Sequence, residues 1–239
     1  MPAKTKETPK YRTPLEPAPS ALDRLAEAYA WTRTHSRALT VGTLALGLAL
    51  ASAVYYVHYT RDLEAAAAVA LEQPRASVQS GNTNLALNDL RQFLAQYGST
   101  RLAREARVML ATVLLQAGQP REAYREVRDV ASKTDDPVGA RAALVAGAAL
   151  EAAGDTAAAI RHYLAIADRL NMTFQKRDAL AAAARLQELA GDYDGAAQTY
   201  ARIVQLLDAE AVERPYYEMR LAEMRTRAGI RAGVQSGSN

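Results

Sequence analysis

The chain has 239 residues and no cysteine, so disulfides, thiolate metal sites and cysteine nucleophiles are excluded. Its three histidines, His35, His58 and His162, are far apart in the sequence and offer little material for a metal or acid–base site. Residues 1–37 carry seven Lys or Arg and four Asp or Glu, whereas residues 38–239 carry 22 of each sign. The larger part of the chain is therefore neutral, and we do not expect it to bind nucleic acid.

The first part of the chain predicts a tail followed by a surface helix. Residues 1–20 contain five prolines and scattered charges, which predict a disordered tail. Residues 21–37 place Leu22, Leu25 and Tyr29 on one helical face. We therefore expect an amphipathic helix that lies on a membrane surface beside the next segment.

Residues 38–57 are an apolar segment without a charged residue. A helix of this length spans about 30 Å, the thickness of the hydrocarbon core of a bilayer, so we predict a transmembrane helix in contact with lipid. Ala51-Ser52-Ala53 also matches a signal-peptide cleavage pattern. The 37 residues before the segment are long for a signal, and the apolar run continues to Val57. We expect an uncleaved anchor and keep cleavage as the alternative.

The charges that flank this segment predict its orientation. Arg24, Arg33 and Arg37 precede it, whereas Arg61 and Arg75 are the only positive residues that follow it closely. Because positive residues favour the cytoplasmic side, we expect the N-terminus in the cytoplasm and the rest of the chain on the far side.

A repeat with a nearly constant period follows the apolar segment. Four glycines are spaced 37, 36 and 37 residues apart, and an alanine follows each of them five residues later. Glycine can end a helix in the left-handed conformation, an aspartate after it can cap the next helix, and the alanine permits close helix packing. This period predicts a solenoid of helix pairs. The glycines are Gly81, Gly118, Gly154 and Gly191, and the alanines are Ala86, Ala123, Ala159 and Ala196.

The helices on either side of each glycine have clear apolar faces. Asp136 and Pro137 predict the start of a first helix, while Asp155 and Asp192 are placed to cap second helices. A kink is expected near Pro74. The expected first helices span residues 63–79, 101–117, 138–153 and 174–190, and a last helix at 216–229 closes the end.

These patterns resemble the tetratricopeptide repeat. The sequence GDYDGAAQTYARIVQL, which starts at Gly191, is similar to the turn and second helix of that repeat, and Gly147 matches its small residue at the helix crossing. The resemblance covers residues 62–230. It implies an all-α fold, a solenoid of TPR-like helical hairpins after a single transmembrane helix. We place the repeat domain at residues 58–230 and a flexible tail at 231–239.

The order of tail, membrane helix and repeats also resembles the YfgM family of bacterial inner-membrane proteins. That resemblance implies a single-pass protein of the bacterial inner membrane with a periplasmic repeat domain. It further implies a scaffold or adaptor beside the SecYEG translocon that links it to periplasmic chaperones. A structural subunit of a cell-wall or outer-membrane assembly complex is the alternative.

The resemblance to the tetratricopeptide repeat also indicates a protein-binding face, formed by the first helices. Val108, Leu144 and Ala181 stand where a lysine would be needed to grip a C-terminal carboxylate, so that ligand is not expected. No catalytic constellation is visible, and we expect no enzyme activity, metal, cofactor or small-molecule substrate. The candidate residues are Glu105, Val108, Thr112, Leu115, Arg141, Leu144, Ala148, Glu151, Asp178, Ala181, Arg185 and Glu188.

Overall fold

The computed structural model describes residues 22, 24, 29, 31 and 36–237. The predicted tail (residues 1–20) and most of the predicted surface helix (residues 21–37) lie outside these residues. Every regular element in the described part is helical, which confirms the all-α prediction. The chain separates into two compact units, Met1–Tyr59 and Thr60–Asn239.

Helix α2 (Ser36–Ala70) contains the predicted transmembrane segment. Its apolar side chains are exposed; Leu44, Leu46 and Leu48 show between 61% and 77% of their surface. Within the described residues, the stretch Thr40–Gln79 is the one helix long and apolar enough to cross a membrane. A continuous exposed apolar surface of this kind fits a helix that lies in lipid.

Helix α2 ends close to Pro74, where the sequence predicted a kink. The break comes at Leu71, and α3 (Glu72–Gln79) follows it directly. Pro74 has no N–H to donate to the Ala70 carbonyl four residues earlier, and its ring crowds that carbonyl. The helical ladder therefore loses a hydrogen bond at the junction of α2 and α3.

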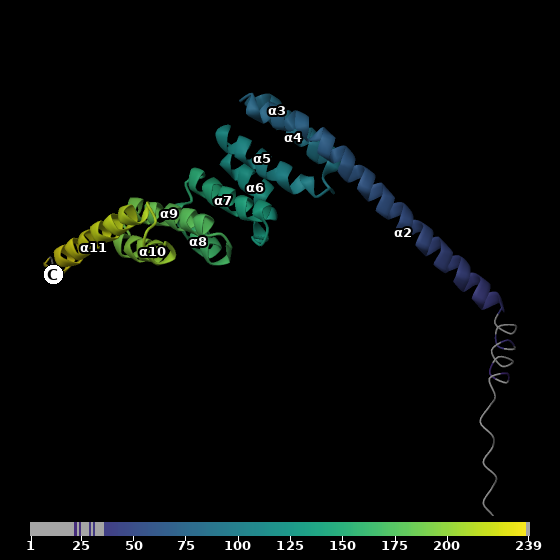
Figure 1. Cartoon of the computed structure of the whole chain (residues 1–239). Helices are drawn as coiled ribbons and strands as arrows, with labels where there is room; N and C mark the ends of the chain where they lie inside the picture. Colours follow the sequence, from purple (N-terminus) through teal and green to yellow (C-terminus); the bar gives the residue numbers. More distant parts are fainter. Residues whose placement is uncertain (1–21, 23, 25–28, 30, 32–35, 238–239) are drawn as a thin grey trace, which may run out of the picture. The chain divides into compact units, whose positions relative to one another are not determined.

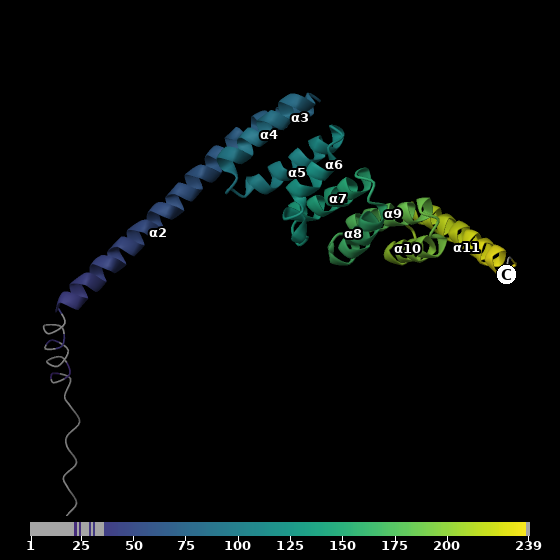
Figure 2. The ribbon, with the colours of Figure 1, turned by 180° about the vertical axis from the view of Figure 1, so that it is seen from behind.

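The second unit consists of helices that follow one another in pairs (Figures 1 and 2). The first pair is α3 with α4, the second α5 with α6, the third α7 with α8 and the fourth α9 with α10; α11 packs against α10. This succession confirms the TPR-like architecture. The bounds are α4 Thr83–Tyr97, α5 Leu102–Gln116, α6 Pro120–Val127, a 3-10 turn Val130–Ser132, α7 Pro137–Ala152, α8 Thr156–Arg169, α9 Thr173–Leu189, α10 Tyr193–Leu206 and α11 Arg214–Gly237.

Each pair turns at one of the four glycines. Gly81, Gly118, Gly154 and Gly191 have φ between 72° and 81°, a region that residues with a Cβ rarely adopt. In the second pair the Gly118 N–H donates to the Leu115 carbonyl (3.0 Å). This bond satisfies a carbonyl at the end of the first helix of the pair.

The predicted caps are confirmed. The Asp155 carboxylate accepts a hydrogen bond from the Ala158 N–H (3.2 Å), and Asp192 accepts one from the Gly195 N–H (3.0 Å). Asp136 accepts one from the Gly139 N–H (2.8 Å) and so starts α7. Each aspartate satisfies a donor that the helix itself leaves open.

The alanine that follows each glycine is buried. Ala86, Ala123, Ala159 and Ala196 are at most 1% exposed. In the third pair Gly147 of α7 contacts Tyr163 of α8 so closely that a Cβ on Gly147 would lie 2.4 Å from the tyrosine ring. Small residues therefore set the distance between paired helices.

Two helices differ from their predicted lengths. Val127 and Val130 are three residues apart, a spacing that favours one continuous helix, but α6 ends at Val127 and a 3-10 turn carries Val130. Both valines remain buried. Helix α11 continues to Gly237, beyond the expected end at residue 229.

Candidate protein-binding surface

The twelve candidate residues lie on α5, α7 and α9, the first helices of the second, third and fourth pairs. Arg141, Asp178 and Arg185 are exposed. Val108 is only 2% exposed, so its side chain belongs to the core and is not available on a surface. The remaining candidates are half-buried: Glu105, Thr112, Leu115, Leu144, Ala148, Glu151, Ala181 and Glu188.

Ion pairs between successive pairs of helices connect several of these residues. The Arg185 guanidinium of α9 contacts both carboxylate oxygens of Glu151 on α7, at 2.7 and 2.8 Å. The Glu105 carboxylate of α5 pairs with Arg75 of α3 at 2.9 Å. The structure thus brings charged candidates together across neighbouring first helices, and these charges are neutralised within the chain.

The sequence interpretation assigned Glu151 and Arg185 to a partner and did not foresee that they pair with each other. A signal was present, because the two residues have opposite charges and are 34 positions apart, close to one repeat. Residues one repeat apart lie side by side in a solenoid. Opposite charges at that spacing therefore indicate a contact between units.

The apolar candidates on these three first helices are called the apolar strip. Leu115, Leu144, Ala148 and Ala181 are half-buried. Leu115, Leu144 and Ala181 pack against the core. The Thr112 hydroxyl donates to the Val108 carbonyl of its own helix (2.8 Å). Such a strip favours apolar contact over charge recognition.

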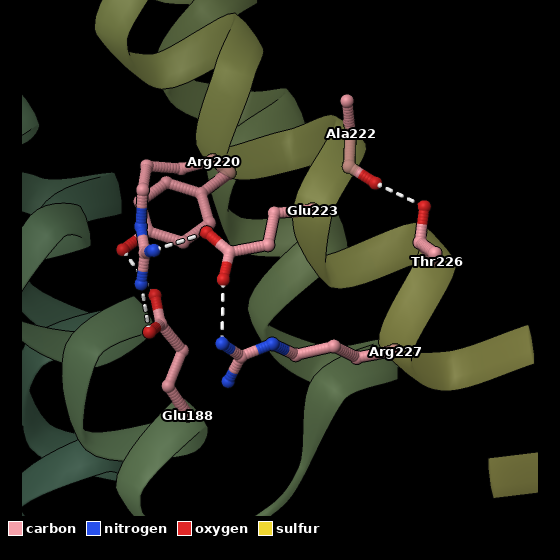
Figure 3. Close-up of polar contacts among 7 residues, drawn as sticks. Glu188, Arg220, Ala222, Glu223, Thr226 and Arg227 are labelled. Atoms are coloured by element: carbon pink, nitrogen blue, oxygen red, sulfur yellow. Dashed lines mark hydrogen bonds and ion pairs between the residues drawn. The ribbon is translucent and has the colours of Figure 1, made fainter. Parts of the chain in front are cut away.

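Glu188 belongs to a polar cluster that holds α11 (Figure 3). Arg220 of α11 forms ion pairs with Glu188 and with Glu223, and Arg227 pairs with Glu223 at 2.6 Å. The Tyr200 hydroxyl of α10 donates to Glu188 at 2.5 Å. Glu188 has a side chain only 13% exposed, so it connects α9, α10 and α11 and is largely withdrawn from solvent.

Two buried tyrosines in the second unit have altered acidity. Burial, followed by the hydrogen bond to Glu188, raises the pKa of Tyr200 to about 12. Burial, followed by the nearby Glu151 carboxylate, raises the pKa of Tyr163 to about 12. Both effects disfavour the phenolate, so both tyrosines stay neutral at physiological pH.

In the part of the chain that the structure describes, no group of three or more histidine or acidic side chains is arranged to hold a metal ion. Several of the charged residues form ion pairs between helices, such as Arg202 of α10 with Asp168 of α8 at 2.5 Å and Arg91 of α4 with Glu122 of α6 at 2.8 Å. Their geometry serves the stacking of units.

The class of protein follows from comparison with known families. Residues 29–162, more than half of the chain, match the profile of the family described as tetratricopeptide repeat-like domain. The chain belongs to this family. The match begins before the apolar segment of α2 and ends within α8. Domains built on this fold generally act as scaffolds that bind other proteins.

Solved structures support the same fold. The TPR-like repeats of a kinesin light chain protein from Podosopora anserina superpose on this chain with a TM-score of 0.54 at 19% identity, over 70% of this chain and 89% of that chain. A tetratricopeptide repeat protein from Parabacteroides merdae gives a TM-score of 0.55 at 17% identity, over 67% of this chain and 60% of that chain. At these identities the likeness shows the fold alone. No curated protein sequence matches the chain significantly.

Proposed function

We propose that this protein is a membrane-anchored scaffold whose repeat domain binds other proteins on the periplasmic side of a bacterial inner membrane. One observation carries the proposal: the family match runs without interruption from residue 29, through the apolar segment, into the repeats. An apolar segment of membrane-spanning length and the repeats of this chain therefore fall within one family match. An anchor of this kind confines a binding domain to one membrane surface.

The side of the membrane follows from charge. The positive residues before the segment, such as Arg24 and Arg37, favour a cytoplasmic N-terminus, so the repeats lie on the opposite side. Protease added to spheroplasts should then digest the repeat domain. Digestion only in inverted vesicles would reverse the topology.

The narrower proposal is a place beside the Sec translocon, linking it to periplasmic chaperones. It is supported by the similarity of this order of parts to the YfgM family. Retrieval of translocon subunits with the full-length protein from solubilised membranes is the expected result. Retrieval of wall enzymes or outer-membrane assembly proteins in their place would favour the alternative, a structural role in envelope assembly.

The proposed contact surface is the apolar strip on α5, α7 and α9. Its neighbours Glu105, Glu151 and Arg185 are paired within the chain, so an apolar segment of a partner can pack on it while these ion pairs stay intact. Arg141, which has no ion-pair partner among the described residues, lies on α7 with Leu144 and Ala148 and can orient that segment.

Site-specific photo-cross-linking in intact membranes tests this surface. A photoreactive amino acid at Leu144 or Ala148 should give cross-linked partner proteins. The matched control positions are Arg161 on α8 and Gln198 on α10, which are exposed on second helices. Cross-links from the second helices alone would show that a different face binds.

A further inference from the structure

The first helix pair contains a polar pocket of about 280 Å³. Ala70 at the end of α2, Gln73 at the start of α3 and three polar side chains of α4 line it. The side chains from α4 are the Asp89 carboxylate and the amides of Gln92 and Gln96. One carboxylate and several amides make a site that suits a cationic hydrogen-bond donor.

Asp89 is the unusual member of this pocket because it is a carboxylate that is only 9% exposed. The Ser77 hydroxyl of α3 donates to its Oδ2 atom at 2.5 Å. Among the described residues, no lysine, arginine or histidine pairs with Asp89. Burial of a carboxylate without a cation costs free energy, so the pocket holds an uncompensated negative charge.

The next repeat shows what compensates a carboxylate at this place. Gly81 and Gly118 are 37 residues apart, and the same offset relates Asp89 to Glu126. In the second pair the Arg107 guanidinium of α5 forms an ion pair with Glu126 of α6 at 3.1 Å. The residue 37 positions before Arg107 is Ala70, which lines the pocket.

The later pairs fill this position without a carboxylate. In the third pair it is His162, whose Nε2 atom lies 2.8 Å from the Ala143 carbonyl of the first helix. In the fourth pair it is Thr199, whose hydroxyl donates to Gln187 of the first helix at 2.7 Å. The first pair thus has a carboxylate, Asp89, at this position but no arginine to match Arg107, and the pocket lies where that arginine would be.

We infer that this pocket receives the guanidinium of an arginine side chain from a protein partner, at the place that Arg107 occupies in the second pair. A guanidinium presents a planar set of donors that pairs with a carboxylate and also reaches amide oxygens. The carboxylate of Asp89 supplies the charge, and the carbonyls of Gln73, Gln92 and Gln96 accept the remaining N–H groups. The end of α2 and residues of α3 and α4 line the pocket, whereas the apolar strip lies on α5, α7 and α9. Binding in the pocket can therefore be tested separately from binding on the strip.

A pair of peptides that differ in one group tests the inference directly. The full-length protein in detergent micelles is titrated with a fluorescein-labelled Gly-Ser-Gly-Arg-Gly-Ser-Gly peptide and with the same peptide carrying citrulline, the neutral isostere of arginine. We expect the arginine peptide to bind at least about tenfold more tightly, since a charge-assisted bidentate pair is lost in citrulline. Equal binding of both peptides would overturn the inference.

Substitutions assign the binding to the pocket. Asp89→Asn keeps an acceptor for Ser77 and should reduce binding of the arginine peptide to the citrulline level. Asp194→Asn removes an exposed carboxylate of α10 and should leave binding unchanged. Equal losses in both variants, or no loss in Asp89→Asn, would contradict the assignment.

The chain can also be made to fill its own pocket. Ala70→Arg copies Arg107 of the second pair and should both abolish binding of the arginine peptide and raise the unfolding midpoint by about 2–4 °C. The double variant Ala70→Arg/Asp89→Asn should lose that gain. Light scattering tests whether the arginine that fills the pocket comes from a second copy of this chain. A dimer of the parent protein that dissociates in Asp89→Asn would overturn the assignment to a different protein partner.

Discussion

The first and third helix pairs have the same turn and different interiors. In α7 and α8 the interface consists of small residues, with Gly147 against the ring of Tyr163 and Ala159 fully buried. In α3 and α4 the interface contains Pro74, the hydrogen-bonded Ser77 and Asp89, and an open pocket. The repeat therefore fixes the turn and the crossing distance but leaves other positions free to differ. The third pair is closely packed at these positions, whereas the first pair has a polar cavity.

The largest expected effect tests the close packing of the third pair. Gly147→Ala adds a Cβ that would lie 2.4 Å from a ring atom of the buried Tyr163. The helices must separate or the ring must leave its rotamer, at a cost of about 2–3 kcal/mol in the free energy of unfolding. Urea unfolding of residues 60–239 followed by circular dichroism measures it.

Gly229→Ala is the matched control, because no atom lies within 4 Å of a Cβ at that position of α11. There alanine should stabilise the helix by roughly 0.5–1 kcal/mol through its higher propensity. A harmless Gly147→Ala would show that the third pair is not closely packed.

A smaller effect is expected from the polar interior of the first pair. Ser77→Ala removes the hydroxyl that donates to Asp89 and leaves a buried carboxylate without this partner. The expected loss is about 1–2 kcal/mol in the free energy of unfolding. The exposed Ser99→Ala should change it by less than about 0.5 kcal/mol. The same loss from both serines would mean that the Ser77–Asp89 bond contributes nothing.

The smallest effect concerns alkaline pH and distinguishes the third pair through Tyr163. The pKa of Tyr163 is raised to about 12 from the ordinary value of 10.0. Between these values the folded chain keeps a proton that the unfolded chain releases, so stability falls as pH rises from about 10 to about 12. At pH 11 Tyr163→Phe should be less sensitive to alkali by about 1 kcal/mol.

The same measurement on Tyr200→Phe should show a comparable relief, because the pKa of Tyr200 is also raised to about 12. Tyr216→Phe is the control, since the Tyr216 side chain is 54% exposed. If all three variants kept the slope of the parent protein above pH 10, burial of the two tyrosines would be contradicted.

The sequence was sufficient to predict the architecture because its signals are local. A glycine with positive φ and an aspartate that caps the next helix act within a few residues, so Gly154 and Asp155 can be interpreted without a structure. The role of Gly147 could also be predicted, since two helices that cross this closely leave no room for a side chain at the crossing point. The 36- to 37-residue period then determines how the pairs follow one another.

The candidate surface could be predicted only in part, because its properties depend on distant residues. Whether Glu188 faces a partner or an internal arginine depends on Arg220, which is 32 residues away. Val108 was expected on the surface, but in the structure it is buried, since a helix inside a solenoid is covered on more than one side. The pocket beside Asp89 arises from a missing arginine and is visible only when two repeats are compared.

The central claim is that the glycine–alanine register sets the contact between paired helices and so supports the proposed binding surface. Ala159 is fully buried in α8, whereas Ala157, two residues earlier, is exposed. Urea unfolding of residues 60–239 with Ala159→Leu should show a loss of about 1–3 kcal/mol, because the larger side chain cannot fit between α7 and α8. Ala157→Leu should change the free energy of unfolding by less than about 0.5 kcal/mol. Equal losses from the two substitutions would contradict the register and the surface built on it.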